Sequence, residues 1–182
     1  NWAGNYKVKF WDAPWQNIIF SYIDTIISQG FDGIYLDIID AYYYWQVENP
    51  QKPYADTLMI SFVKNIRNHI SSVTPDTFYM IPQNAEDIVN STNVSPAQKS
   101  AYFNAIDAAG VEDVFFYGNL DEDNNYNPDQ YRLTQLQEYL LNGKQVFSIE
   151  YLTQPAKIQQ YISAVTAQGF VPLVCVRNLD QL

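Results

Sequence analysis

The feature that most constrains the fold is a regular alternation of short apolar runs with helical segments. The first helical segment has Pro14 near its start and Gly30 at its end, and the last has Pro155 and Gly169 in the same places. Proline early in a helix and glycine just past its end are the expected asymmetry of helix termini. Six apolar runs rich in β-branched and aromatic residues predict buried strands: "YKVKFW" (6–11), "GIYLDII" (33–39), "FYMIP" (78–82), "DVFFYG" (113–118), "QVFSIEYL" (145–152) and "VPLVCVR" (171–177).

Strands that alternate with helices imply parallel βαβ units. Further helices are predicted over residues 54–72, from Ser95 to Gly110 and from Asn127 to Gly143. About six strands fit either a flavodoxin-like sheet or part of an eight-stranded (β/α)8 TIM-type barrel. Several polar residues at strand ends favour the barrel. We therefore predict one α/β domain over residues 1–182.

Composition excludes several classes of partner and cofactor. The net charge of −10 argues against nucleic acid and anionic membrane surfaces. No apolar run reaches the roughly 18 residues that a membrane helix needs, so membrane insertion is not expected. The chain has one histidine, His69, and one cysteine, Cys175, which excludes a His/Cys zinc site. Neither a metal nor another cofactor is expected, and no dinucleotide-binding loop is present.

Carboxylates stand at the ends of several predicted strands. Asp37 closes an apolar strand, where a carboxylate is costly unless it is paired or functional, and Glu150 meets the same test. Glu86 follows the strand that ends at Pro82. Two carboxylates about 5–9 Å apart are the minimum equipment for cleaving a glycosidic bond. Asp37, Glu86 and Glu150 are thus candidate catalytic acids; for each one alone, solvation or helix capping is the alternative.

Four consecutive aromatic residues, Tyr42 to Trp45, come shortly after Asp37, in the stretch "AYYYW". Aromatic faces stack on the C–H faces of sugars, although part of such a cluster serves ordinary packing. The candidate substrate-binding residues share a position at or just beyond a strand end. They are Trp11, Asp40, Tyr43, Trp45, Asn84, Tyr117 and Glu122.

The segments "NYKVKFWDAPWQ", "GFDGIYLDIIDAYYYW", "MIPQNAEDI" and "SIEYL" resemble glycoside hydrolase family 114, the endo-α-1,4-polygalactosaminidase-like family, over nearly the whole chain. The resemblance implies a (β/α)8-type barrel, a metal-free acid pair and hydrolysis of α-1,4-linked galactosamine polymers. It places the family's strand-four aspartate on Asp37 and its strand-five glutamate on Glu86, which makes these two the expected catalytic pair and Glu150 a possible third acid. A cationic galactosamine polymer would suit the acidic surface, and the family tendency favours an extracellular or extracytoplasmic location.

Members of the family usually have two further βα units before the segment "NYKVKFW". The chain is therefore expected to form strands three to eight of an incomplete barrel. Residues 6–11 and 171–177 would then carry open strand edges, through which self-association is expected. A non-catalytic carbohydrate-binding barrel and a structural domain are the alternative functions.

Overall fold

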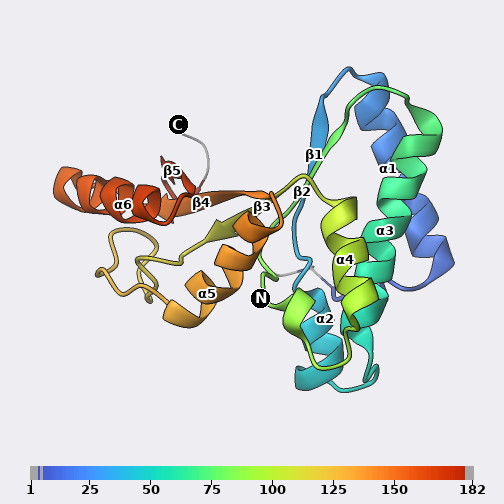
Figure 1. Cartoon of the computed structure of the whole chain (residues 1–182), viewed down its shortest axis with the longest axis horizontal. Helices are drawn as coiled ribbons and strands as arrows, with labels where there is room; N and C mark the ends of the chain where they lie inside the picture. The colour runs from blue at the N-terminus through green and yellow to red at the C-terminus, as the bar shows by residue number, and fades with distance from the viewer. Residues whose placement is uncertain (1–3, 5, 179–182) are drawn as a thin grey trace. The chain divides into compact units, whose positions relative to one another are not determined.

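A computed structural model describes residue 4 and residues 6–178 (Figure 1). The chain divides into two compact units. Unit 1 comprises Asn1–Ile81 and Ile88–Ile106, and unit 2 comprises Pro82–Asp87 and Asp107–Leu182. The chain therefore passes from one unit to the other three times.

Unit 1 combines a small sheet with a layer of helices. Its strands β1 (Gly33–Leu36) and β2 (Tyr79–Pro82) form a two-stranded parallel sheet. Figure 1 shows its longer helices side by side. These are α1 (Ala13–Ser28), α3 (Ala55–Val73) and α4 (Pro96–Ala105), with the short α2 (Ala41–Tyr43), a π-helical turn (Tyr44–Glu48) and a 3₁₀ turn (Ile88–Asn90) between them.

The local sequence explains these elements. Ser95 and Gln98 form the reciprocal capping box that starts α4. Phe62, Ile66 and Ile70 recur at helical spacing along α3 and are buried, as their pattern predicts. A side chain at Gly33 would stand 2.6 Å from the carbonyl oxygen of Tyr79, so only glycine lets β1 and β2 approach this closely.

A buried carboxylate, Asp56, joins three segments of unit 1. Its side chain is 0% exposed and accepts hydrogen bonds from the Thr57 N–H at 2.7 Å and Gln46 Nε2 at 3.2 Å. Ser91 Oγ and Asn93 Nδ2 donate to the same carboxylate, the latter at 3.1 Å. Asp56 therefore fixes the start of α3 to the π-helical turn and to the turn before α4.

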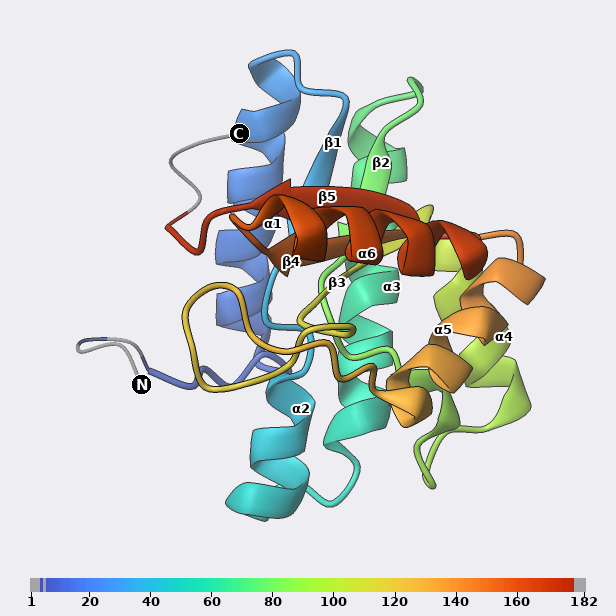
Figure 2. The same cartoon turned by 90° about the vertical axis from the view of Figure 1, so that its left-hand side faces the viewer.

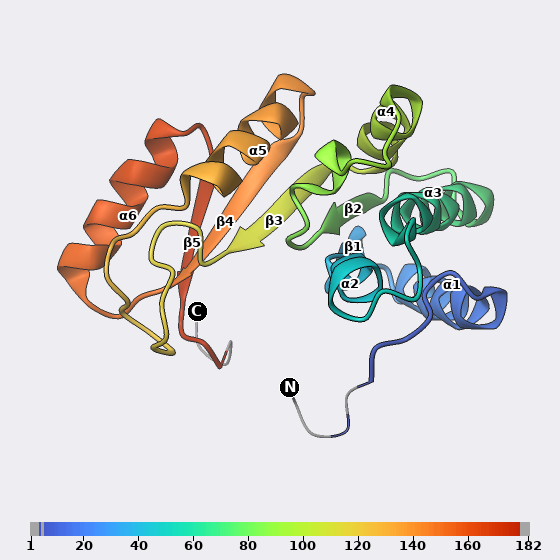
Figure 3. The same cartoon turned by 90° about the horizontal axis from the view of Figure 1, so that it is seen from below.

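Unit 2 is a three-stranded parallel sheet of order β3-β4-β5. Its elements are β3 (Ala108–Glu112), α5 (Gln130–Leu141), β4 (Gln145–Tyr151), α6 (Pro155–Ala167) and β5 (Val171–Cys175). Figure 3 shows α5 and α6 on one side of this sheet, and Figure 2 shows α6 lying across β4 and β5. Gln83 forms a parallel bridge with Gly110, so the segment after β2 runs beside β3.

Two of the six predicted strands are wrong. Residues 6–11 form no strand, because neighbouring side chains take their carbonyl groups: Trp45 Nε1 donates to Val8 O at 3.1 Å, and Gln16 Nε2 donates to Phe10 O at 3.0 Å. Residues 113–118 form a loop whose backbone N–H groups bind a side chain, as described below. The strand of this region is β3, which starts at Ala108, five residues before the start of the predicted strand.

Two predicted helix ends also change. The helix α4 ends at Ala105, and Gly110 lies inside β3. The helix α5 is capped by Asp129, whose side chain accepts from the Arg132 N–H, and not by Asn127.

The α/β class with parallel strands is confirmed. Closure of these strands into an incomplete eight-stranded barrel stays a prediction, as does self-association through open edges. Among the described helices, none combines the length and apolar character that a membrane span requires.

Candidate active site

The first candidate acid, Asp37, lies directly after β1. Its side chain is exposed, so the apolar residues around it do not enclose the carboxylate. Its Oδ1 accepts a hydrogen bond from the Ile38 N–H at 2.8 Å. Ile38 has φ of 61°, a left-handed conformation that a β-branched residue adopts only under strain. The structure thus holds Asp37 at the strand end with its carboxylate accessible.

The aromatic residues of unit 1 divide into exposed and packed rings. Tyr43 is 48% exposed, whereas Trp45 is 7% exposed and its ring contacts that of Trp11 edge-on at 5.2 Å. Trp11 is half-buried, with Lys52 Nζ 5.0 Å from its ring centroid. Asp40 is exposed at the start of α2 and forms no side-chain capping hydrogen bond there. Substrate contacts by these residues stay predictions, and this geometry favours Tyr43 over Trp45.

Tyr43→Ala is expected to weaken the binding of long oligosaccharides about fivefold, the equivalent of about 1 kcal/mol for one stacked ring. Binding of a monosaccharide should change little, because a stacking subsite lies away from the bond that is cleaved. Calorimetric titration with oligomers of increasing length measures this. Tyr22→Ala, on an exposed ring of α1, is the control. Equal losses for short and long ligands would indicate packing instead.

In unit 2, Glu86 is held by an arginine from α5. Arg132 Nε donates to Glu86 Oε1, and Arg132 Nη2 lies 3.5 Å from Glu86 Oε2. The same guanidinium donates to Asn84 Oδ1 at 3.2 Å and to the Glu112 carbonyl at 2.9 Å. Arg132 therefore brings two of the predicted residues, Asn84 and Glu86, to the carboxyl end of β3.

A second chain of contacts runs across the ends of β3, β4 and β5. Tyr151 donates its hydroxyl hydrogen to Glu112 Oε2, and Arg177 stacks on the Tyr151 ring at 3.6 Å. Arg177 also pairs with Asp113 through both terminal nitrogens, at 2.8 and 3.0 Å. Burial, and then the hydrogen bond to Glu112, raise the pKa of Tyr151 well above its usual value, so its hydroxyl stays a donor.

Glu150 lies on the opposite face of β4. Side chains alternate along a strand, so Glu150 shares a face with Val146 and Ser148, all fully buried under the helices. Its Oε1 accepts from the N–H groups of Phe115 and Phe116 at 2.6 and 3.3 Å, which fixes the loop after β3. The third-acid role of Glu150 stays a prediction, and its position favours a structural role.

Burial raises the pKa of Glu150 to about 7, against the lowering effect of the Phe115 N–H and with a further increase from the negative charge of Asp113. In the unfolded chain the group ionises near its usual value of 4.5. The stability that protonated Glu150 contributes is therefore complete below pH 4.5 and is lost as the pH rises through 7.

Glu150→Gln is expected to remove this pH dependence. Between pH 5 and pH 8 the free energy of unfolding of the wild type should fall relative to the variant by about 2–3 kcal/mol. Urea denaturation of both proteins across this range measures the difference. Parallel stability curves would show that Glu150 does not titrate between these values.

The remaining predicted residues lie on the loop between β3 and α5. Tyr117 is exposed, and Glu122 Oε1 accepts from the Arg177 N–H at 3.3 Å. Asp123 accepts from the Thr153 and Gln154 N–H groups at 3.0 and 3.1 Å, at the start of α6. This loop is thus anchored to the ends of β4 and β5.

Backbone strain gathers at the same places as the acids. Among the described residues, the non-glycine residues with positive φ are Ile38, Asn84, Ala85, Asp113 and Asp123, with values from 54° to 61°. All of them follow the carboxyl end of a strand or lie on the loop after β3. Conformations of this kind cluster at functional sites, where the surrounding structure imposes them.

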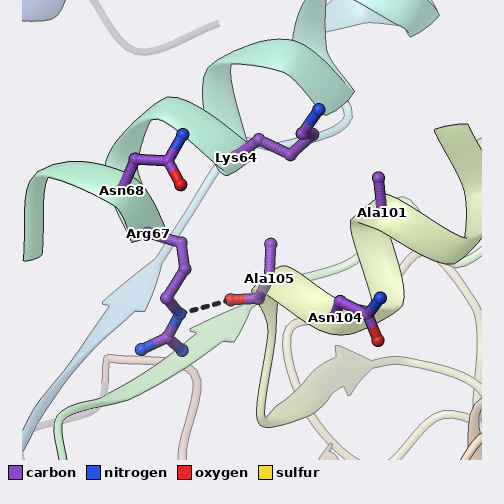
Figure 4. A pocket seen from close by; sticks show the side chains of 6 residues that line it. All are labelled: Lys64, Arg67, Asn68, Ala101, Asn104 and Ala105. Carbon is purple, nitrogen blue, oxygen red and sulfur yellow. Dashed lines mark hydrogen bonds between the residues drawn. The ribbon is translucent and has the colours of Figure 1, made fainter. Parts of the chain in front are cut away.

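A surface pocket of about 240 Å³ lies elsewhere, between α3 and α4 of unit 1 (Figure 4). Its lining consists of Lys64, Arg67, Asn68, Ala101, Asn104 and Ala105. Arg67 Nε donates to the Ala105 carbonyl at 2.7 Å, so this guanidinium ties the two helices together. The pocket contains no carboxylate and none of the predicted site residues. Within the part of the chain that the structure describes, no group of three or more His, Cys, Asp or Glu residues could hold a metal ion.

Carboxylates beyond the ends of parallel strands, together with exposed aromatic rings, are typical of enzymes that cleave glycosidic bonds. The model of glycoside hydrolase family GH114 matches the chain over residues 1–182. The chain therefore belongs to family GH114, and the resemblance seen in the sequence is confirmed.

The relatives of the chain are longer than the chain itself. An uncharacterized protein of Deinococcus radiodurans is 33% identical over 182 residues, which are 100% of this chain and 54% of the relative. An uncharacterized protein of Methanocaldococcus jannaschii is 32% identical over 193 residues, covering 100% of this chain and 53% of the relative. The chain thus spans about half the length of the curated relatives that it matches.

Among solved structures, the glycoside hydrolase domain of PelA from Pseudomonas aeruginosa matches with a TM-score of 0.70. The match covers 96% of this chain and 65% of that chain at 15% sequence identity. A likeness at this identity shows a shared fold.

Sequence reasoning did not find Glu112, Tyr151 or Arg132. Glu112 was missed because the strand was predicted over residues 113–118, which begin after it. The signal that could have found it is the acid pair "ED" directly after the short apolar stretch "AAGV". Arg132 lies in α5, and no local sequence pattern there indicates its contact with Glu86.

Proposed function

We propose that this chain acts as an endo-glycosidase that cleaves α-1,4-linked galactosamine polysaccharide with Asp37 and Glu86 as its acid pair. The observation that carries the proposal is the family match over all 182 residues. It is supported by the position of both carboxylates just beyond strand ends, which is where parallel α/β enzymes hold their catalytic groups.

In such a mechanism one carboxyl group protonates the glycosidic oxygen, while the other attacks the sugar or activates water. The exposed Asp37 suits the group that meets the sugar directly. Arg132 holds Glu86 and Asn84 in fixed positions, as a preorganised site requires. We also propose that the protein acts outside the cytoplasm, on a polysaccharide.

The net charge of −10 supports a cationic substrate. Deacetylated galactosamine carries an ammonium group near neutral pH, and an acidic surface concentrates such a polymer around the protein. Binding should accordingly weaken as the salt concentration rises.

Incubation of the chain with partially deacetylated galactosamine oligomers, followed by chromatography of the products, tests the proposal. We expect internal cleavage into shorter oligomers, and no cleavage of glucosamine oligomers of the same length. Release of single sugars from one end would contradict the endo mode. Binding of the oligomers without turnover would favour the alternative of a non-catalytic carbohydrate-binding barrel.

A further inference from the structure

The carboxyl end of β3 in unit 2 carries a carboxylate that the acid pair does not use. Glu112 is the last residue of β3 and is paired in register with Ile149 of β4. Its side chain therefore lies on the same face as Tyr151, opposite to Glu150 and to the helices. It is half-buried, so it remains accessible to a ligand.

Two neutral groups hold the Glu112 carboxylate. Asn84 Nδ2 donates to Oε1 at 3.2 Å, and the Tyr151 hydroxyl donates to Oε2. Asn84 also accepts from the Glu112 N–H at 3.3 Å, so backbone and side chain are both fixed. The stacking of Arg177 on Tyr151 in turn keeps the tyrosine in place.

The acidic side chains around Glu112 form ion pairs with arginines, but Glu112 does not. Arg132 pairs with Glu86, and Arg177 pairs with Asp113. Arg177 interacts electrostatically with Glu112, but among the described residues no lysine, arginine or histidine lies within ion-pair distance of this carboxylate, whose donors are the uncharged Asn84 and Tyr151. An ionised carboxylate offers about four acceptor positions, of which these donors occupy two. The site is thus a fixed, half-buried carboxylate with acceptor positions left for a cationic donor.

We propose that Glu112 binds the ammonium group of an amino-sugar unit next to Glu86, with Tyr151 and Arg177 as its positioning residues. This inference rests on the proposed function and assigns the residue that distinguishes a deacetylated from an N-acetylated sugar. Glu86 is close along the network, because Arg132 bonds to both Glu86 and Asn84 and Asn84 bonds to Glu112.

Glu112→Gln tests the assignment. The amide keeps the size of the side chain, and its oxygen and nitrogen can still pair with Asn84 and Tyr151, so the fold should persist. Calorimetric titration in an Asp37→Asn background, which prevents turnover, compares galactosamine oligomers with N-acetylated oligomers of equal length. We expect Glu112→Gln to weaken binding of the deacetylated oligomer about 10- to 100-fold, as for a lost charge-assisted hydrogen bond, and binding of the N-acetylated oligomer less than about threefold.

Glu138→Gln is the matched control, since Glu138 is a half-buried glutamate of α5, on the opposite side of the sheet from Glu112, and should leave this preference unchanged. Tyr151→Phe should reduce the preference partially, because Glu112 then loses one fixed contact. Equal losses for both oligomers, or none for either, would overturn the role of Glu112. Loss of the preference in Glu112→Gln, in a chain whose wild type binds but does not hydrolyse, would overturn the proposed function alone. A folded wild type that binds neither oligomer would overturn both.

Discussion

Asp37→Asn is expected to lower kcat on galactosamine oligomers by about 10³-fold or more while leaving the thermal unfolding midpoint unchanged within about 2 °C. A catalytic carboxylate contributes through its charge or its proton, and an amide supplies neither. The fold should persist, because an asparagine oxygen can accept the Ile38 N–H as Asp37 Oδ1 does. Initial rates at saturating substrate, with a thermal melt of the same sample, measure the two quantities.

Asp32→Asn provides a matched control. Asp32 is an exposed aspartate that precedes β1, at the opposite end of the strand from Asp37. It should retain the wild-type rate, since only the carboxyl end of the strand is assigned to the site. Turnover by Asp37→Asn at the wild-type rate would remove Asp37 from the mechanism. A loss of rate that accompanies a large fall in melting temperature would point to a structural role.

The largest expected effect on stability is that of Asp56→Ala. The substitution leaves the N–H of Thr57 and the side-chain donors of Gln46 and Ser91 without their acceptor at a position that is 0% exposed, while Asn93 keeps its hydrogen bond to the Pro53 carbonyl. Each unsatisfied buried donor costs about 1 kcal/mol or more, so we expect a loss of about 3 kcal/mol in the free energy of unfolding. Such a loss is a large fraction of the stability of a domain of this size.

Urea denaturation at constant pH measures the effect. Asp76→Ala is the control: Asp76 is an exposed aspartate of the same unit whose carboxylate bonds locally with Thr74, and its loss should change stability by less than about 0.5 kcal/mol. A change below about 1 kcal/mol in Asp56→Ala would show that water replaces the carboxylate without penalty.

The sequence predicts elements well where local pattern and tertiary structure agree. β4 and β5 are rich in β-branched residues, and α1 and α6 have proline at their start and glycine past their end, so both kinds of element were found. β3 reads "AAGVE", whose small residues and glycine resemble the end of a helix. It nevertheless forms a strand, because its backbone hydrogen bonds to β4 depend little on side-chain type.

The candidate site shows the same division between local and long-range information. The acids at Asp37 and Glu86 follow recognisable strands, so their positions beyond strand ends were predictable. The face on which an acid lies was not, because it depends on register: Glu150 turns toward the helices, and Glu112 toward Tyr151. Arg132 reaches Glu86 across 46 positions of sequence, a pairing that no short motif records.

The interleaving of the two units has a consequence for recombination. Asn84 and Glu86 belong to unit 2 but precede Ile88–Ile106, which belongs to unit 1. A single crossover after Asp87 between two homologous genes would therefore combine Glu86 from one parent with Arg132 from the other. Chimeras that exchange Pro82–Asp87 together with Asp107–Leu182 keep the pair of Glu86 and Arg132 intact. A substitution at either of these two residues should be inherited with a compensating substitution at the other.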